Sequence, residues 1–349
     1  MNVKQKKFLP IAIILVVFAV AYFYPLPYFV SAPGEAMELS PIVKVEQGYP
    51  EQGSFMLTTI RMGEANIFNY ALARWDEYRD IVPKEVLLAH YQNEEEFTQR
   101  QIQVMESSKE NAIAVAYELA GRDVQIEYKG VMVVSTIEDM PAEEHFQFGD
   151  IITHVDGEEV HTAEALIKYL KDKSLGDEVT ISFTREGESM EAMISLEELP
   201  LTEDEETHEH QPRAGIGIST VTKRNMEVDP PVEIETSRIG GPSAGLMFSL
   251  EIYNQLTEHD ITKGYRVAGT GTIAPDGMVG RIGGIHQKIV AADKAGAEIF
   301  FAPHEEGAEE SNYQRALTAA EDIGTEMKIV PVDYIKDALD YLSELPVHK

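Results

Sequence analysis

The pattern of apolar and polar positions changes several times along this chain of 349 residues. An apolar run starts at Phe8, and no charged residue follows until Glu35. Residues 54–62 (SFMLTTIRM) have the β-branched and aromatic content of a strand. Residues 94–121 repeat apolar positions at helical spacing and end on Gly121, a common helix stop. The first third of the chain is therefore expected to contain an apolar segment, a strand and a long helix.

The pattern between residues 124 and 196 changes and predicts short strands, one helix and glycine-containing turns. Residues 149–157 (GDIITHVDG) predict a strand that is closed by an Asp-Gly turn, and a helix is expected over 162–170. Residues 197–213 are acidic and contain prolines, which predicts a linker. Strands and helices then alternate over 214–349, so the pattern predicts an α+β fold with a separate module in its middle.

Composition excludes several classes of partner and of chemistry. Lysine and arginine number 29 against 60 acidic residues, and the net charge of −31 would repel a nucleic-acid backbone. The chain has no cysteine, which excludes disulfides, thiolate nucleophiles and zinc–thiolate sites. The histidines of the sequence HEH (208–210) lack the spacing that places two metal ligands on one helical face. We therefore expect no nucleic-acid partner and no metal.

The first residues predict a membrane anchor. Residues 1–30 read as a basic tip followed by a transmembrane helix over 8–30, which is long enough to cross a hydrocarbon core of about 30 Å. The basic residues ahead of the apolar run are Lys4, Lys6 and Lys7. They favour a single-pass protein of the cell membrane with a cytoplasmic N-terminus and extracytoplasmic domains. A cleaved signal peptide is the alternative, since residues 30–32 fit a small-residue cleavage site, but Pro33 argues against cleavage.

The candidate nucleophile is Ser243, in the sequence GGPSAG (240–245). A strand is expected over 232–236, and the residues after the serine are apolar nearly all round, which predicts a buried helix. Pro242 suits the first helical position, which would leave Ser243 inside the first turn. The first amides of a helix lack helical partners, so those of Ser243 and Ala244 could form an oxyanion hole. Plain helix capping is the simpler interpretation unless a base lies nearby.

The candidate base is Lys288, on a helix that follows the glycine pair 283–284. It is predicted to share a helical face with Ile285, Ile289 and Ala292. Burial among such neighbours disfavours the charged ammonium and lowers the pKa of a lysine, so the neutral amine could take the serine proton. Lys294, on the same helix, is expected to lie in solvent.

The segments GGPSAG and GGIHQKIVAADKAG together resemble the proteolytic domain of the Lon family of Ser-Lys peptidases. The resemblance implies an α+β protease domain over 214–349, with residues 35–121 as its N-terminal part. By position, Ser243 matches the nucleophile, Lys288 the general base, and Thr270 the threonine that helps to hold the lysine. Gly240 stands where ATP-dependent members carry an acidic residue. The chain also has no phosphate-binding Gly-x-x-x-x-Gly-Lys-Ser/Thr loop, so we expect neither ATP nor another cofactor.

Residues 124–196 resemble a PDZ domain of the bacterial, protease-associated kind. The resemblance implies capture of a peptide by strand addition. The expected groove residues are Gly130, Val131, Met132, Val133, Leu166 and Leu170. The module would be an insertion within the protease domain and would replace an unfolding motor as the selector of substrates, which we expect to be membrane-anchored or secreted proteins. Because the Lon family tends towards rings, a homo-oligomer is also possible.

Two other functions fit parts of the sequence. Residues 241–245 match Gly-x-Ser-x-Gly, the nucleophile elbow of α/β-hydrolase esterases, which would need a histidine as the base. A non-catalytic, anchored PDZ scaffold is the third hypothesis, and it requires Lys288 to point into solvent. The preferred hypothesis is an ATP-independent, membrane-anchored serine endopeptidase.

Overall fold

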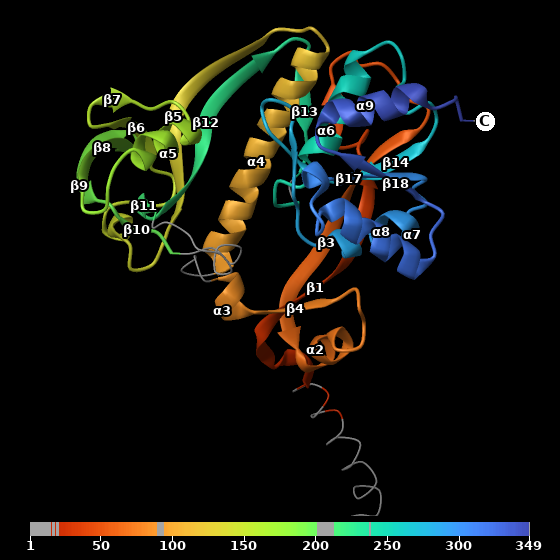
Figure 1. The fold of residues 1–349 in the computed structure, drawn as a ribbon, viewed down its shortest axis with the longest axis horizontal. Helices are drawn as coiled ribbons and strands as arrows, with labels where there is room; N and C mark the ends of the chain where they lie inside the picture. Colours follow the sequence, from red (N-terminus) through yellow and green to blue (C-terminus); the bar gives the residue numbers. More distant parts are fainter. Residues whose placement is uncertain are drawn as a thin grey trace, which may run out of the picture.

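The computed structural model describes residues 15, 18, 21–88, 94–200, 213–236 and 239–348. Figure 1 shows two lobes on either side of the long helix α4 (Glu94–Leu119). The larger lobe holds a mixed sheet with helices on both faces, and the smaller lobe holds an antiparallel sheet with one helix.

The large sheet contains six strands in the order β18-β17-β14-β3-β1-β4. Their bounds are β1 Pro25–Glu38, β3 Ser54–Asn66, β4 Asp80–Pro83, β14 Arg266–Gly269, β17 Ile299–Pro303 and β18 Lys328–Val332. Strands β3, β14, β17 and β18 run parallel, whereas β1 lies antiparallel to both β3 and β4. Three strands precede the smaller lobe in the chain and three follow it. The smaller lobe is therefore inserted between the two halves of one sheet.

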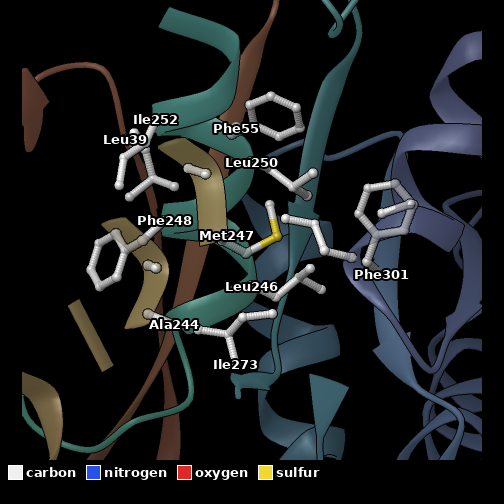
Figure 2. Packing of buried hydrophobic residues seen from close by; sticks show 14 of the residues in the cluster. Leu39, Phe55, Ala244, Leu246, Met247, Phe248, Leu250, Ile252, Ile273 and Phe301 are labelled. Atoms are coloured by element: carbon white, nitrogen blue, oxygen red, sulfur yellow. The ribbon is translucent and has the colours of Figure 1, made fainter. Parts of the chain in front are cut away.

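Alternating side chains of this sheet enter two different cores. Phe55 and Leu57 of β3 pack with α4 and with the helices α6 (Gly245–Leu256) and α9 (Ile335–Glu344). Met56, between them in the sequence, faces the opposite core, with α7 (Ile285–Lys294) and α8 (Asn312–Ile323). Figure 2 shows side chains of α6 packed between Phe55, Leu39 and Phe301. Because both faces of β3 are buried here, its residues 55–57 (FML) are continuously apolar, as is typical of an interior strand.

The remaining short elements connect these layers. They are β2 (Val43–Val45), α2 (Ile67–Ala73), α3 (Lys84–Leu87), β13 (Val232–Ile234), β15 (Thr272–Ile273) and β16 (Val279–Gly280). Strand β2 pairs with β13, and β15 pairs with β16. The first pair lies next to α6 and brings the chain to the turn that contains Ser243.

The smaller lobe has the strand order β12-β5-β6-β8-β9, with the short β7 beside β6. Its elements are β5 Val124–Thr136, β6 Ile151–Val155, β7 Glu158–Glu159, α5 Ala163–Lys171, β8 Glu178–Arg185, β9 Glu188–Ser195 and β12 Ile218–Val228. The predicted Asp-Gly turn joins β6 to β7, with positive φ at both Asp156 and Gly157. Such a pair of φ angles is what a tight two-residue hairpin turn requires.

The boundary expected at residue 214 is corrected by strand β12. It pairs with β5 along its whole length, from Ile218 opposite Thr136 to Val228 opposite Val124. Residues 218–228 therefore belong to the sheet of the smaller lobe rather than to the catalytic lobe. The ends of the expected linker are also ordered, since β10 (Glu197–Glu198) pairs with β11 (Ala214–Gly215). Residues 201–212, including the HEH sequence, lie outside the described residues.

The expected anchor also overlaps the fold. Residues 25–30, assigned to the transmembrane helix from sequence, form the start of β1, and Phe29 and Val30 are buried. The candidate cleavage site at 30–32 lies in the middle of that strand. Within the part of the chain that the structure describes, none of the helices combines the length and apolar character that a membrane span requires. Residues 8–20 of the predicted span, apart from Leu15 and Phe18, lie outside the described residues.

Candidate active site

Ser243 lies in the turn that leads into α6. The helix begins at Gly245 with Ala244 as its N-cap, so Ser243 precedes the helix instead of lying inside its first turn as predicted. Gly241 has a φ of 85°, a conformation that favours glycine. The turn is held by other elements, because Gly241 N donates to Gln101 O of α4 at 2.9 Å and Gly271 N donates to Ser243 O at 2.9 Å. These external bonds keep the residues around Ser243 out of the helix.

The structure brings Ser243, Thr270 and Lys288 together from three elements. Lys288 Nζ of α7 lies 2.7 Å from Ser243 Oγ and 2.9 Å from Thr270 Oγ1. Thr270 follows β14, and its hydroxyl donates to Ser243 O at 2.9 Å. A neutral lysine amine has one lone pair and two hydrogens. It can therefore accept the proton of Ser243 while donating to Thr270, and Thr270 in turn orients the serine backbone.

Lys288 is buried, with 2% of its surface exposed. Burial lowers its pKa from the ordinary 10.5 to about 7, because the ammonium form loses hydration that no buried carboxylate replaces. Its predicted neighbours Ile285, Ile289 and Ala292 are all buried with it in one core. Lys294 at the other end of α7 is exposed, as predicted. A substantial fraction of Lys288 can thus be neutral near pH 7.

Two backbone donors beside Ser243 are available to a ligand. Among the described residues, neither Ser243 N–H nor Ala244 N–H has an intramolecular acceptor. The next amides are occupied, since Leu246 N donates to Gly271 O at 3.1 Å and Gly245 N makes a longer bond of 3.3 Å to Pro242 O. Two free amides next to a hydroxyl are suited to stabilising a negative oxygen. They are the two donors proposed from sequence.

Ser243 and Lys288 open into a cavity of about 740 Å³. Its walls come from the middle of β3, from α4 and from the turn before α6. A second cavity of about 620 Å³ adjoins it and shares Ile60, Gln101 and Met105 of its lining. The wall of the second cavity along α4 is mixed, since Phe97, Ile102 and Met105 alternate with the polar side chains of Thr98, Gln101, Glu106 and Lys109. An extended polypeptide could occupy both cavities at once.

The contribution of α4 to this site was not predicted. Its residues Gln101 and Met105 line the cavity, and Ser108 Oγ donates to Pro242 O at 2.9 Å. The sequence shows only a helix with an apolar stripe, and nothing in that pattern indicates which helix faces Ser243. The approach of α4 depends on Gly245, where a Cβ would lie 2.8 Å from Ser108 Oγ.

The groove expected on the smaller lobe is corrected by the strand order. Residues Gly130–Val133 lie in β5, which bonds to β12 on one side and to β6 on the other. A strand with both edges occupied cannot accept a peptide by strand addition. The terminal strands of this sheet are β12 and β9, and the edge beside α5 is that of β12, where Ala163 N donates to Thr222 Oγ1 at 3.0 Å. Leu166 and Leu170 of α5 are buried in the core of the lobe.

The geometry bears on both alternative functions. No histidine lines the cavity around Ser243 among the residues described, so the base that an α/β-hydrolase requires is missing there. The strand β13 also ends at Ile234, well before the turn, whereas a nucleophile elbow joins strand and helix directly. Lys288 does not point into solvent, which the scaffold hypothesis requires.

Comparison with protein families matches two domains, whose bounds differ from those of the two lobes because the first match includes part of α4 and the second includes β12. Residues 104–196 match a PDZ domain, and residues 210–344 match the Lon protease (S16) C-terminal proteolytic domain. The Lon protease of Metamycoplasma arthritidis is 31% identical over 128 residues, which cover 37% of this chain and 14% of that protein. The Lon protease of Xanthomonas oryzae pv. oryzae is 31% identical over 135 residues, covering 39% of this chain and 15% of that protein. The chain therefore spans only a small part of these relatives.

One solved structure is similar to part of the chain. The PDZ domain of the SdrC-like protein from Listeria monocytogenes is 30% identical, with a TM-score of 0.24, and the match covers 28% of this chain and 93% of that domain.

Proposed function

Because this chain carries a PDZ domain and the proteolytic domain of a Lon-like serine peptidase, we propose that it cleaves polypeptides with a Ser243–Lys288 dyad and without ATP. The observation that carries the proposal is the 2.7 Å approach of a buried lysine amine to a serine hydroxyl beside two free amides. Three required parts, a nucleophile, a base and an oxyanion site, are then present at one cavity.

The reaction follows from these positions. Neutral Lys288 takes the proton of Ser243 Oγ, which attacks the carbonyl carbon of the scissile peptide bond. The amides of Ser243 and Ala244 donate to the oxygen of the tetrahedral intermediate. Protonated Lys288 then gives its proton to the leaving amine, and a water molecule activated by Lys288 releases the acyl group. Thr270 keeps the lysine aligned throughout.

The proposal is tested by labelling and cleavage with the full chain in the absence of nucleotide. A fluorophosphonate probe is expected to modify Ser243, located by peptide mass spectrometry, and a denatured polypeptide should be cut at internal bonds. Labelling at another serine, or a requirement for ATP, would contradict the proposal. Hydrolysis of simple esters without peptide cleavage would support the esterase alternative instead.

We also infer that the PDZ lobe selects substrates through the edge of β12. The edge strand lies beside α5, and a glycine turn with Gly217 at a φ of 83° precedes it. An added peptide strand would hydrogen-bond to β12, and backbone amides of the preceding turn would receive its C-terminal carboxylate.

The binding of labelled peptides tests this selection. Peptides that end in valine with a free carboxylate should bind the full-length Ser243→Ala protein at least about tenfold more tightly than their amidated counterparts, because amidation removes a charge-assisted hydrogen bond. Fluorescence anisotropy measures both affinities, and the amidated peptide is the matched control. Equal affinities would show that the terminus is not read.

The third part of the proposal is anchoring to a membrane by the apolar residues before β1. It is supported by the uncharged run from Phe8 and by exposed apolar side chains where that run meets the fold. Phe18 stacks on Phe68 of α2 at a centroid distance of 5.4 Å, and nearby Trp75 is 91% exposed. Aromatic side chains of this kind collect at the interface between lipid and water.

Trp75 is the only tryptophan of the chain, which makes it an unambiguous probe. In vesicles of phosphatidylcholine and phosphatidylglycerol, acyl chains brominated near the headgroup should quench most of its fluorescence. The matched control moves the fluorophore to the PDZ lobe, with Trp75→Phe combined with Tyr128→Trp, and should resist quenching. Sedimentation with the vesicles tests anchoring separately. If the protein sediments with the vesicles but Trp75 is not quenched, only the contact of Trp75 with lipid is excluded.

A further inference from the structure

We propose that Ser108 is a positioning residue that holds one half of the oxyanion site in its working orientation. The proposal rests on the peptidase function above and concerns the peptide unit between Pro242 and Ser243. Ser108 does not reach the cavity wall formed by Gln101 and Met105. It acts from behind the turn, through a hydrogen bond to a carbonyl.

The argument begins with the geometry of a trans peptide, in which the C=O and the N–H of one unit point in opposite directions. Ser108 Oγ donates to Pro242 O at 2.9 Å. That bond fixes the plane of the unit and thereby directs the Ser243 N–H away from α4. The carbonyl is held on the protein side, and the free amide is presented on the other side.

The neighbouring unit is held in the same manner. Ser243 O accepts hydrogen bonds from Thr270 Oγ1 and from Gly271 N, both at 2.9 Å. This orients the N–H of Ala244, the second candidate donor. Each oxyanion donor is therefore oriented through the carbonyl of its own peptide unit. Helix α4 holds the unit that carries the Ser243 N–H, and the residues after β14 hold the unit that carries the Ala244 N–H.

The first unit depends more heavily on a single side chain. Apart from Ser108, Pro242 O receives only the 3.3 Å bond from Gly245 N among the described residues. The unit rotates through ψ of Pro242 and φ of Ser243, and the ring of proline fixes only its own φ. Without the serine hydroxyl, rotation of the 242–243 unit would turn a carbonyl oxygen towards the developing negative charge and remove a donor from it.

The structure around Ser108 fits this role better than that of an ordinary helix serine. A serine inside a helix usually donates to a carbonyl of its own preceding turn or faces solvent. Ser108 is 4% exposed, and its acceptor is 134 residues away in the sequence. The close approach requires a glycine at 245, where any side chain would meet Ser108 Oγ at 2.8 Å.

The experiment compares Ser108→Ala with Ser107→Ala, a neighbouring serine of the same helix, in the full-length protein. We expect Ser108→Ala to lower kcat about 10²-fold with little change in KM, as for the loss or misplacement of one oxyanion donor. Ser107→Ala should keep the wild-type kcat. Ser108→Thr retains the hydroxyl and should recover part of the activity.

A second readout separates positioning from a general structural effect. A peptide boronic acid bonded to Ser243 places an oxygen in the oxyanion site, so its affinity should fall by the same factor as kcat/KM. The affinity for the carboxylic acid product of the same sequence should stay unchanged. Wild-type kcat in Ser108→Ala, or a lower kcat with unchanged boronate affinity, would overturn the proposal. If Ser108→Ala fails to fold, Ser108→Cys is used instead, because a thiol is a weaker hydrogen-bond donor than a hydroxyl. Its boronate affinity should fall by the same factor as its kcat/KM, and unchanged boronate affinity with a lower kcat would overturn the proposal.

The outcome is distinguishable from failure of the proposed peptidase function. Absence of both cleavage and boronate binding in the wild-type protein would overturn the dyad and the role of Ser108 together. Wild-type cleavage combined with an unaffected Ser108→Ala variant would overturn the role of Ser108 alone.

Discussion

Replacing Ser243 with alanine is expected to lower kcat/KM for peptide cleavage at least about 10⁴-fold, because it removes the hydroxyl on which the acyl-enzyme would form. The cavity and both free amides would remain, so substrate should still bind. The measurement is the cleavage rate of a fluorogenic peptide by the full-length protein, with binding followed separately by anisotropy. Ser343→Ala, an exposed serine near the C-terminus, is the matched control and should leave the rate unchanged.

A Ser243→Ala protein that still cleaves peptides would exclude Ser243 as the nucleophile. Loss of binding along with cleavage would instead indicate that the substitution disturbs the turn, which is held by several external hydrogen bonds. Retained binding with lost cleavage is the combination that the geometry predicts. It would also make this variant suitable for trapping natural substrates.

Replacing Lys288 with methionine should lower the cleavage rate about 10²- to 10⁴-fold, the usual contribution of a general base. The same substitution is expected to stabilise the fold at neutral pH by roughly 2–4 kcal/mol, because a buried amine gives way to an apolar side chain of similar length. Lys294→Met is the matched control on the same helix and should change neither property, since Lys294 is exposed. Peptide cleavage and urea unfolding measure the two effects.

The stability difference should depend on pH in a defined direction. The pKa of Lys288 is about 7 in the folded protein and returns to the ordinary 10.5 on unfolding. The unfolded chain therefore binds an extra proton between these values, and the cost of burying the amine is largest below pH 7. The advantage of Lys288→Met should shrink as the pH rises from 7 towards 10.5. Equal stability of the two proteins at pH 6 would contradict a desolvated lysine.

The character of Ser243 and Lys288 could be expected from local signals, whereas their pairing is implied by the resemblance to the Lon proteolytic domain. The small residues around Ser243, the apolar run after it and the face shared by Lys288, Ile285 and Ile289 are all visible in short windows of sequence. The start of α6 was misplaced by three residues because Pro242 favours a first helical position only when its neighbours are free to be helical. Here Ser108, Thr270 and Gly271 hold the carbonyls of the turn, and those bonds come from distant parts of the chain.

The larger misassignments have the same physical origin. The uncharged run from Phe8 continues to residue 34, and the pattern alone does not show where a membrane span would end and an interior strand begin. The pairing of β1 with β3 and β4 places residues 25–34 in the sheet. Likewise, residues 130–133 have the pattern of a strand, but pattern alone does not reveal which of its edges is free. The partner β12 lies beyond the acidic segment, so the occupied edge of β5 follows from long-range pairing.

The central claim is that Lys288 is a neutral base beside Ser243, and its pKa is the most direct test. Carbon-13 labelling of lysine side chains allows each Cε resonance to be titrated by NMR, and the Lys288→Met protein identifies the signal that belongs to Lys288. A midpoint about 3 units below that of an ordinary lysine is expected, near pH 7. A midpoint close to the ordinary 10.5 would mean that Lys288 is charged at neutral pH and cannot accept the proton of Ser243.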